Sequence, residues 1–353
     1  QAEMNAQLEV LASKGYNYID QVSKYGKRDK LQQQYNLNVG NASDKNSVYA
    51  SITYRSNRLE DINSKDESIG INLKNSLNVT KWMSVDFGTY INYSDGVTQT
   101  FNLMSPGYTI MPYDDLVNAD GTNYTKTAAE RYSVENLKKI TDYKLYNMDI
   151  TPMDEIYWNN QRSRDFTNRI YTRLNINILK DLKSSTSFQY EYGNYRISQL
   201  FDKRSYKVRS DVNSSVTYNA GEFRLPYGHE YYTSTNLTHG YTFRQQLDYN
   251  TKIKEKHEIV AQAGFEVREN QTKYNSDKLY NYDPDMLSYT PIDEKTLSSS
   301  ASGAWGTFSL ASNLDKPYFR EYINRYVSLY GNVAYTFDSK YTFTGSIRWD
   351  RSN

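Results

Sequence analysis

Cysteine is absent from the 353 residues of this sequence, which excludes a disulfide scaffold, a thiolate metal site and a cysteine nucleophile. Long apolar runs are also missing, and the mean hydropathy of −0.83 leaves no candidate for a transmembrane helix. Neither sign of charge dominates, because 42 Lys and Arg residues oppose 41 Asp and Glu residues. The overall charge therefore gives no reason to expect nucleic acid or an anionic membrane surface as a partner.

Sequence motifs for catalysis, cofactor binding or metal binding are lacking as well. No G-x-S-x-G, phosphate-loop or dinucleotide fingerprint occurs, so the common catalytic signatures are missing. The three histidines, His229, His239 and His257, do not have metal-ligand spacing, and we expect them in loops or a turn, exposed to solvent. The Asp120-Gly121 pair is interpreted as a turn former, because the spacing of a calcium loop is lacking. The sequence predicts no enzyme, no cofactor and no metal site.

Aromatic residues are abundant instead, with 36 Tyr, 12 Phe and 4 Trp, a composition typical of strands and interfaces. Ten segments alternate apolar and polar residues with a period of two, which predicts ten β-strands. The predicted strands cover residues 35–39, 48–54, 69–77, 83–93, 170–178, 186–192, 241–253, 259–267, 327–337 and 341–350. The fold class is therefore all-β, an antiparallel up-and-down meander of about ten strands.

The connections between these strands alternate in length. Five are tight and polar, at residues 42–46, 80–81, 180–183, 254–256 and 338–340. Three are very long, at about 95–162, 197–239 and 271–322, and they hold all seven prolines, which suits the missing N–H of proline. Residues 128–146 carry apolar positions at helical spacing, so the first long loop is expected to contain a short helix.

All the long connections fall on one side of the meander, and this arrangement is typical of an outer-membrane β-barrel with short periplasmic turns and long extracellular loops. One strand face would then contact lipid and the other a wet lumen. A soluble antiparallel sheet with one solvated face is the alternative. With the tight turns in the periplasm, both chain ends are expected outside the cell. We therefore expect the chain to be an internal stretch of a larger barrel.

Several hairpins resemble a known family. The segments YNLNVGNASDKNSVYASITY, VTKWMSVDFGTYINYS, LKDLKSSTSFQYEY, KHEIVAQAGFEV and RYVSLYGNVAYTFDSKYTFTGSIRWDRSN are similar, in order and spacing, to mid-barrel hairpins of SusC/RagA-type TonB-dependent outer-membrane transporters. The most specific of them is DSKYTFTGSIRWDRSN. Arg351 departs from the pattern, because the family usually has Gly there. The resemblance covers roughly residues 30–353, and it divides the chain into an extracellular segment, 1–33, and a partial barrel, 34–353.

Such a resemblance implies a barrel of about 22 strands in the outer membrane of a Gram-negative bacterium, closed by a plug domain. It also implies import of oligosaccharides or peptides, with a SusD-like surface lipoprotein as partner. TonB would supply the energy through a plug and TonB box that lie outside this chain. The lipid bilayer would surround the barrel, and nucleic acid is not an expected partner.

Two sets of residues are candidates for contact with the transported molecule. Loop aromatics can stack on sugar rings or peptide side chains, and the candidates are Tyr108, Tyr113, Tyr157, Trp158, Tyr231, Tyr232 and Trp305. Their alternative role is to pack the loops together. The inward polar face, which would line the lumen or meet the plug, includes Asn72, Lys74, Arg173, Asn175, Arg244, Asp248 and Arg348. A passive porin-like barrel and a soluble, secreted carbohydrate-binding β protein remain alternative functions.

Overall fold

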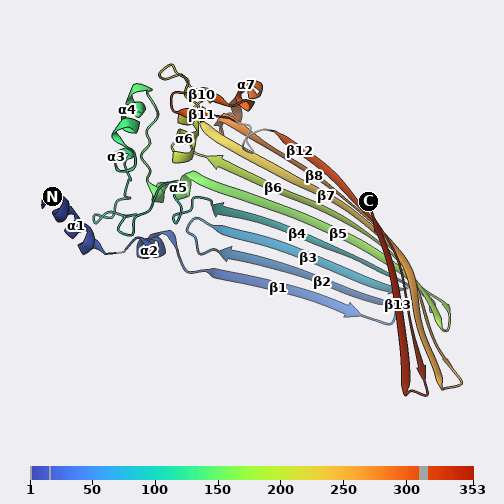
Figure 1. Cartoon of the computed structure of the whole chain (residues 1–353). Coiled ribbons are helices and arrows are strands. Elements are labelled where there is room, and N and C mark those ends of the chain that lie inside the picture. The colour runs from blue at the N-terminus through green and yellow to red at the C-terminus, as the bar shows by residue number, and fades with distance from the viewer. Residues whose placement is uncertain (1, 16, 310–316) are drawn as a thin grey trace.

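The computed structural model describes residues 2–15, 17–309 and 317–353, and it consists of a curved antiparallel sheet with the long connections gathered at one end (Figure 1). The order along the main path of the sheet is β1-β2-β3-β4-β5-β6-β7-β8-β12-β13, so each strand pairs with its neighbours in sequence. The predicted meander of about ten strands is confirmed. The sheet is open in this chain, with β1 and β13 at its two edges.

Every predicted strand is present, and every one is longer than its alternating core. The bounds are β1 Leu31–Ala42, β2 Asn46–Arg58, β3 Lys65–Asn78, β4 Met83–Gln99, β5 Asn159–Leu179, β6 Leu182–Phe201, β7 His229–Ile253, β8 His257–Asp283, β12 Tyr318–Phe337 and β13 Tyr341–Ser352. The long connections are correspondingly shorter than predicted and run over residues 100–158, 202–228 and 284–317. Residues 310–316 of the last one lie outside the described residues. The first strand begins at Leu31, so the predicted boundary at residue 34 falls within β1.

The tight turns lie where the sequence predicted them. Two have consecutive residues with positive φ, Lys254 and Glu255 (49° and 57°) and Asp338 and Ser339 (48° and 54°). This is the backbone of a type I′ turn, whose twist matches that of the flanking strands. In the second turn, the Lys340 amino group lies 2.8 Å from the Asp338 carboxylate. These turns set the register of both hairpins.

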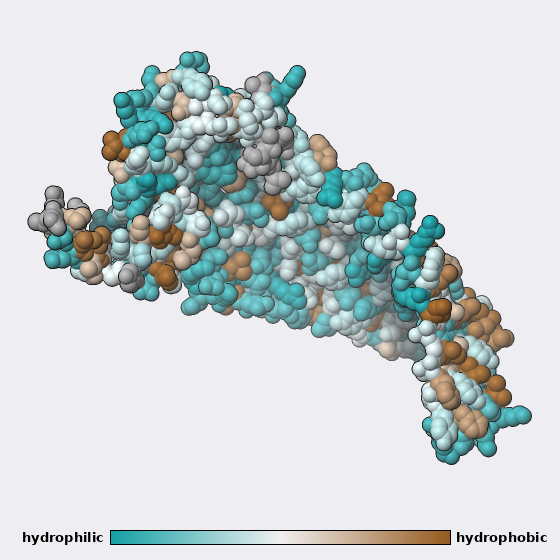
Figure 2. Space-filling view, in the orientation of Figure 1, coloured by the Kyte–Doolittle hydropathy of each residue, from teal (hydrophilic) through white to brown (hydrophobic). Residues whose placement is uncertain are grey.

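The register separates the sheet into an apolar and a polar face. Residues directly opposite each other share a face, and Leu37, Ile52, Ile71 and Ile91 form one such row across four strands. On this face the large apolar side chains are exposed, for example Ile347 at 76%. The opposite, concave face is mostly hydrophilic, and apolar side chains come into view over β13 (Figure 2). A wide exposed apolar face is typical of a surface that contacts lipid or protein.

The long connections carry the remaining elements and the buried cores. They include α1 Ala2–Lys14, α2 Tyr18–Gln21, a π-helix Val22–Gly26, α3 Ala128–Arg131, α4 Val134–Asp142, α5 Pro152–Trp158, α6 Tyr206–Ser214, β9 Ser288–Thr290, α7 Glu294–Ser298, β10 Ala301–Gly303 and β11 Gly306–Phe308. The helix predicted within residues 128–146 is present as α3 and α4. In the part of the chain that the structure describes, no helix has the length and apolar character needed to cross a membrane.

Two small hydrophobic clusters hold these connections together. One joins Tyr18 and Val22 of the N-terminal segment to Leu116 and Ile156 of the first long connection. The other packs Val208 and Val212 of α6 with partners that include Tyr280 of β8. The loop end is therefore a packed layer with its own cores, attached to the ends of the strands.

Candidate functional site

The seven residues predicted on the inward polar face all lie on the concave face of the sheet. The register pairs Asn72 with Tyr90 and Arg173 with Asp86, and it pairs Arg244 with Glu266 and Arg348 with Tyr330. Opposite residues share a face, and residues two apart on a strand share it too. The whole set is Asn72, Lys74, Arg173, Asn175, Arg244, Asp248 and Arg348.

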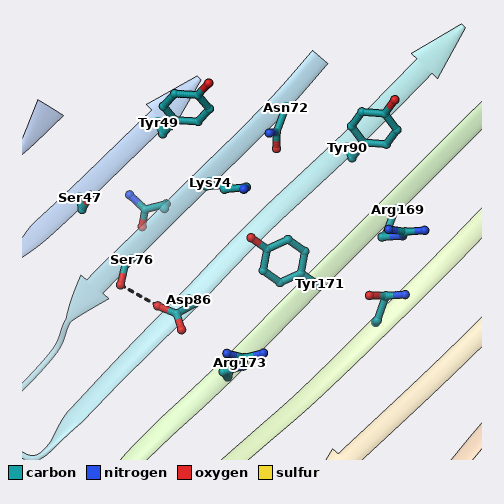
Figure 3. Close-up of a pocket in the computed structure, with 12 residues that line it drawn as sticks. Ser47, Tyr49, Asn72, Lys74, Ser76, Asp86, Tyr90, Arg169, Tyr171 and Arg173 are labelled. Atoms are coloured by element: carbon teal, nitrogen blue, oxygen red, sulfur yellow. Dashed lines mark hydrogen bonds between the residues drawn. The ribbon is translucent and has the colours of Figure 1, made fainter. Parts of the chain in front are cut away.

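A hollow in the concave face gathers one group of these side chains across β2 to β6 (Figure 3). Lys74, Arg169 and Arg173 contribute the cations, and Asp86 lies among them. Asp86 accepts hydrogen bonds from the Ser76 hydroxyl (2.6 Å) and from the Asn175 amide (3.1 Å). Arg169 is already paired with Glu191, because its Nε donates to that carboxylate at 2.6 Å. Lys74 and Arg173 beside Asp86 therefore favour an anionic group in this hollow.

A second polar network covers β7 to β13 on the same face. Arg244 Nε donates to the Glu266 carboxylate at 2.8 Å. The Tyr330 hydroxyl donates to Gln246 at 3.0 Å, and the Gln246 amide donates to Asp248 at 2.9 Å. Arg348, which sequence reasoning placed on this face, donates to Asp350 through Nε at 2.9 Å. Arg244, Asp248 and Arg348 each form a hydrogen bond with a neighbouring side chain, so the network is ordered before any ligand binds.

The loop aromatics do not form one site. Tyr231 and Tyr232 were predicted in a loop, and this was wrong, because both lie in β7. As neighbours on a strand they point to opposite faces. Tyr231 stacks on Tyr282 with 4.8 Å between ring centroids, whereas the Tyr232 hydroxyl lies 3.3 Å from that of Tyr274.

Two of the predicted aromatics are linked by a residue that sequence reasoning missed. The Arg131 guanidinium lies over the rings of Tyr108 (5.4 Å) and Tyr132 (5.2 Å). Trp305 then packs edge-on against Tyr132, with 6.2 Å between ring centroids. Arg131 also donates to the Tyr206 hydroxyl at 2.8 Å. Burial raises the pKa of Tyr108 to about 12, so this tyrosine is neutral at physiological pH.

The other loop aromatics are spread apart. Tyr113 is half-buried in the first connection. Trp158, at the end of α5, has the guanidinium of Arg204 over its ring at 5.1 Å. Tyr157 stays 57% exposed and so keeps a free aromatic face. Of the seven candidates, Tyr157 is the best placed to meet a partner or substrate without rearrangement of the loops.

Buried charges beneath the loops were also missed by sequence reasoning. The Glu155 carboxylate is 1% exposed and accepts hydrogen bonds from the Tyr206 backbone N–H (2.6 Å) and the Asn159 amide (2.7 Å). Burial raises the pKa of Glu155 above its ordinary value. A charged residue in a polar loop is normally exposed to water, so the local sequence pattern does not predict that Glu155 is buried.

A second buried pair attaches α6 to the sheet. The Lys278 amino group of β8 lies 2.9 Å from the Glu230 carboxylate of β7, and both side chains are almost fully buried. Asp211 of α6 lies 3.9 Å from Lys278, and Lys207 of α6 lies 3.9 Å from Glu230. These charges tie the second long connection to the two longest strands.

The histidines correct another expectation. All three lie in strands, not in loops or a turn. The His239 ring contacts the Tyr190 hydroxyl at 3.1 Å, and the His257 ring contacts that of Tyr335 at 2.6 Å. Within residues 2–15, 17–309 and 317–353, no three His, Cys, Asp or Glu side chains are grouped so that they could hold a metal ion.

Comparison with known proteins gives matches of structure only. No family model matches the chain, and no curated protein matches it either. Two solved structures of the RagAB peptide importer, in its closed-closed and open-open states, match with a TM-score of 0.66 and 16% identity over 94% of this chain. A structure of the RagAB peptide transporter matches with a TM-score of 0.63 and 17% identity over 91% of this chain. The chain has the fold of part of a SusC/RagA-type transporter barrel.

The match covers most of this chain but only part of the RagAB chains. The chain spans about a third of the RagAB chains, because 32% to 33% of their length is covered. This agrees with the expected partial barrel, and the resemblance seen in the hairpins is confirmed at the level of fold. The structural neighbours are transporters and receptors rather than enzymes.

Proposed function

We propose that this chain is the wall and outer loops of one part of a TonB-dependent nutrient importer of the Gram-negative outer membrane. One observation carries the proposal: a ten-strand meander has an exposed apolar face, a polar concave face and all its long connections at one end. A soluble sheet would leave that apolar face in water at a large cost in free energy. A barrel wall places it in lipid.

In this proposal the concave face lines the lumen or meets the plug, and the tight turns lie in the periplasm. The N-terminal segment of residues 2–30, with α1, α2 and the π-helix, belongs to the extracellular side. The packed loop layer then offers a surface for a SusD-like lipoprotein, with Tyr157 among the exposed aromatic groups. TonB would act on a plug domain elsewhere in the parent protein.

The transported molecule is an oligosaccharide or a peptide, and peptides are the first class to test. The support is that the RagAB structures matched here are those of a peptide importer. The cations of the concave hollow suit the carboxylates of a peptide as well as the polar surface of a sugar. We therefore propose a peptide as substrate, with an oligosaccharide as the competing outcome.

The experiment is uptake by whole cells that lack the parent gene, complemented with the full-length protein. Fluorescent peptides and fluorescent oligosaccharides are supplied separately, with and without removal of the TonB box. We expect peptide uptake that depends on both the gene and the TonB box. Uptake without the TonB box would indicate a passive pore. Recovery of the protein from the culture supernatant would contradict the proposal altogether.

A further inference from the structure

The apolar face of the sheet carries an unusual group of cations just beyond its last aromatic row. Tyr54, Ile69, Tyr93 and Phe166 form that row across β2 to β5. The group, here called the rim cations, consists of Arg58, Lys65, Arg164 and Arg196. All four are exposed and lie on the apolar face by register.

The rim cations are arranged as two pairs of like charge. Arg58 lies directly opposite Lys65 across β2 and β3, and Arg164 lies directly opposite Arg196 across β5 and β6. Like charges at directly opposed positions destabilise a sheet. An anion between them would remove the repulsion, and a guanidinium pair is well suited to bind phosphate oxygens in a bidentate manner.

Carboxylates on the same face do not balance these charges. Asp95 binds Arg162 with two hydrogen bonds and lies 3.5 Å from Arg164. Glu67 lies opposite Asp95, on the side away from Arg164. Among the described residues, Arg58, Lys65 and Arg196 form no ion pair. Within strands β2 to β6, beyond the aromatic row, five cations (the rim cations and Arg162) therefore share this face with two carboxylates, Glu67 and Asp95.

The other side of the sheet provides an internal comparison. On β8 and β12 the same face has Arg325 beside Glu269, at 2.6 Å, and Lys273 beside Glu321, at 3.7 Å. Cations there have carboxylate partners across the strands. Positive charge on this face is thus in excess on β2 to β6 but balanced between β8 and β12.

The position of the rim cations identifies the source of the anion. Each lies 12 to 15 residues from the tight-turn end of its strand, and a tilted strand crosses the hydrocarbon in about 9 to 11 residues. They therefore lie where headgroups begin. We propose that the rim cations of β2 to β6 bind the phosphate group of an anionic lipid in the leaflet next to the loops. This inference rests on the membrane placement in the proposed function.

The test uses the full-length protein, purified in detergent, and native mass spectrometry with added phosphatidylglycerol or phosphatidylcholine. We expect the unmodified protein to retain the anionic lipid preferentially. Each cation near a membrane surface contributes about a fivefold gain in affinity, so the double variant Arg164→Gln with Arg196→Gln should lose roughly twenty-five-fold of that preference. Arg325→Gln, on the balanced side of the rim, is the matched control and should keep it.

The outcomes separate this inference from the function it rests on. Unchanged lipid preference in the double variant would overturn the phosphate site, even for a protein found in the outer membrane. Displacement of the lipid by millimolar inorganic phosphate would assign a site for free anions and overturn the lipid. If the proposed function is wrong, the protein will be absent from the membrane fraction, and this is seen in cell fractionation before any lipid is added. Removal of repelling charges should leave the thermal unfolding temperature of the double variant unchanged or higher, which guards against misfolding as the cause.

Discussion

Tyr171 of β5 lies directly opposite Gly88 of β4, and its side chain covers the glycine closely. A Cβ atom at position 88 would lie 2.6 Å from two ring carbons and from the hydroxyl oxygen of Tyr171. Tyr171 lines the concave hollow of Figure 3, where it is seen between Lys74 and Arg173. The glycine thus leaves room for an aromatic ring that lies along the sheet, an arrangement known to support glycine in strands.

Gly88→Ala should therefore displace Tyr171 and reduce the free energy of unfolding by about 1–3 kcal/mol, the usual cost of overpacking. The measurement is denaturant unfolding of the full-length protein in detergent. Gly70→Ala is the matched control, because the nearest atom to a Cβ there is 3.7 Å away. A Gly88→Ala protein as stable as the Gly70→Ala protein would contradict this account of Tyr171.

The assignment of the two faces can be tested with introduced thiols, because this chain has no cysteine of its own. Lys74→Cys, on the concave face, should react quickly with a membrane-impermeant maleimide when the protein is in liposomes. Leu73→Cys, its neighbour on the apolar face, should be protected by lipid and react at least about tenfold more slowly. Equal labelling rates would count against lipid contact by the apolar face.

The buried pair of Lys278 and Glu230 should be a strong determinant of stability. Removal of Lys278 takes away the nearest cation of the buried Glu230 carboxylate and leaves Lys207 at 3.9 Å. Loss of one partner of a buried ion pair typically costs about 3–5 kcal/mol. Lys278→Met should therefore release α6 from the sheet and expose the second long connection to proteases. The control is Lys340→Met, which breaks the exposed pair with Asp338 and should cost no more than about 1 kcal/mol. Similar protease resistance in both variants would refute this role.

Glu155 should make the loop layer sensitive to pH. Its pKa is raised in the folded protein by burial, so the folded state holds this proton more tightly than the unfolded state. The stabilising contribution is present below the unfolded pKa and is lost as pH rises through the folded pKa. Limited proteolysis of the loops should consequently accelerate as the pH rises above the ordinary pKa of a glutamate and through the raised pKa of Glu155.

Glu155→Gln is the variant that isolates this effect. The amide oxygen can still accept a hydrogen bond from the Tyr206 N–H, but the side chain no longer titrates. The rate of loop cleavage in this variant should depend less on pH than in the unmodified protein. A pH profile that is identical in both proteins would assign the effect to other groups.

Arg131→Ala should loosen the aromatic cluster that joins Tyr108 to Trp305. The variant loses contacts with three tyrosine rings and the hydrogen bond to Tyr206, a change expected to cost about 2 kcal/mol. The emission of Trp305 should shift to longer wavelength as the residue becomes more hydrated. The shift is best measured in a background where the other three tryptophans of this chain, Trp82, Trp158 and Trp349, are replaced by Phe. An unshifted spectrum would argue against the cluster.

The part of the sheet with one apolar and one polar face could be predicted from sequence, because two such faces impose a strict alternation along each strand. Ile69, Ile71 and Leu73 alternate with polar residues, and a one-residue slip would exchange their faces. Beyond the apolar band both faces are polar, so the alternation fades. Residues 229–239 are mixed Tyr, Thr, Ser and Asn, and for that reason this part of β7 was predicted as loop.

The site was less predictable than the fold. The alternation of side chains along each strand correctly predicted that Lys74 and Arg173 share a face. That prediction needs only the residues next to each of them in the sequence. The contacts of Arg131 with Tyr108 and of Lys278 with Glu230 join segments far apart in the chain. No local pattern carries such pairings, because each polar residue would be equally suited to water when taken alone.

The register also determines the slope of the strands. Ala42, at the end of β1, shares a row with Arg244 of β7 through the intervening strands, yet β7 continues for nine residues to Ile253. With about 3.3 Å per residue and about 4.8 Å between strands, this stagger over six strand steps corresponds to a tilt of about 45° if the tight turns are level. At that tilt the 25 residues of β7 rise roughly 60 Å, about twice the thickness of a bilayer core. In the membrane placement of the proposed function, the upper half of the wall would therefore stand clear of the lipid and carry the loop layer well above the cell surface.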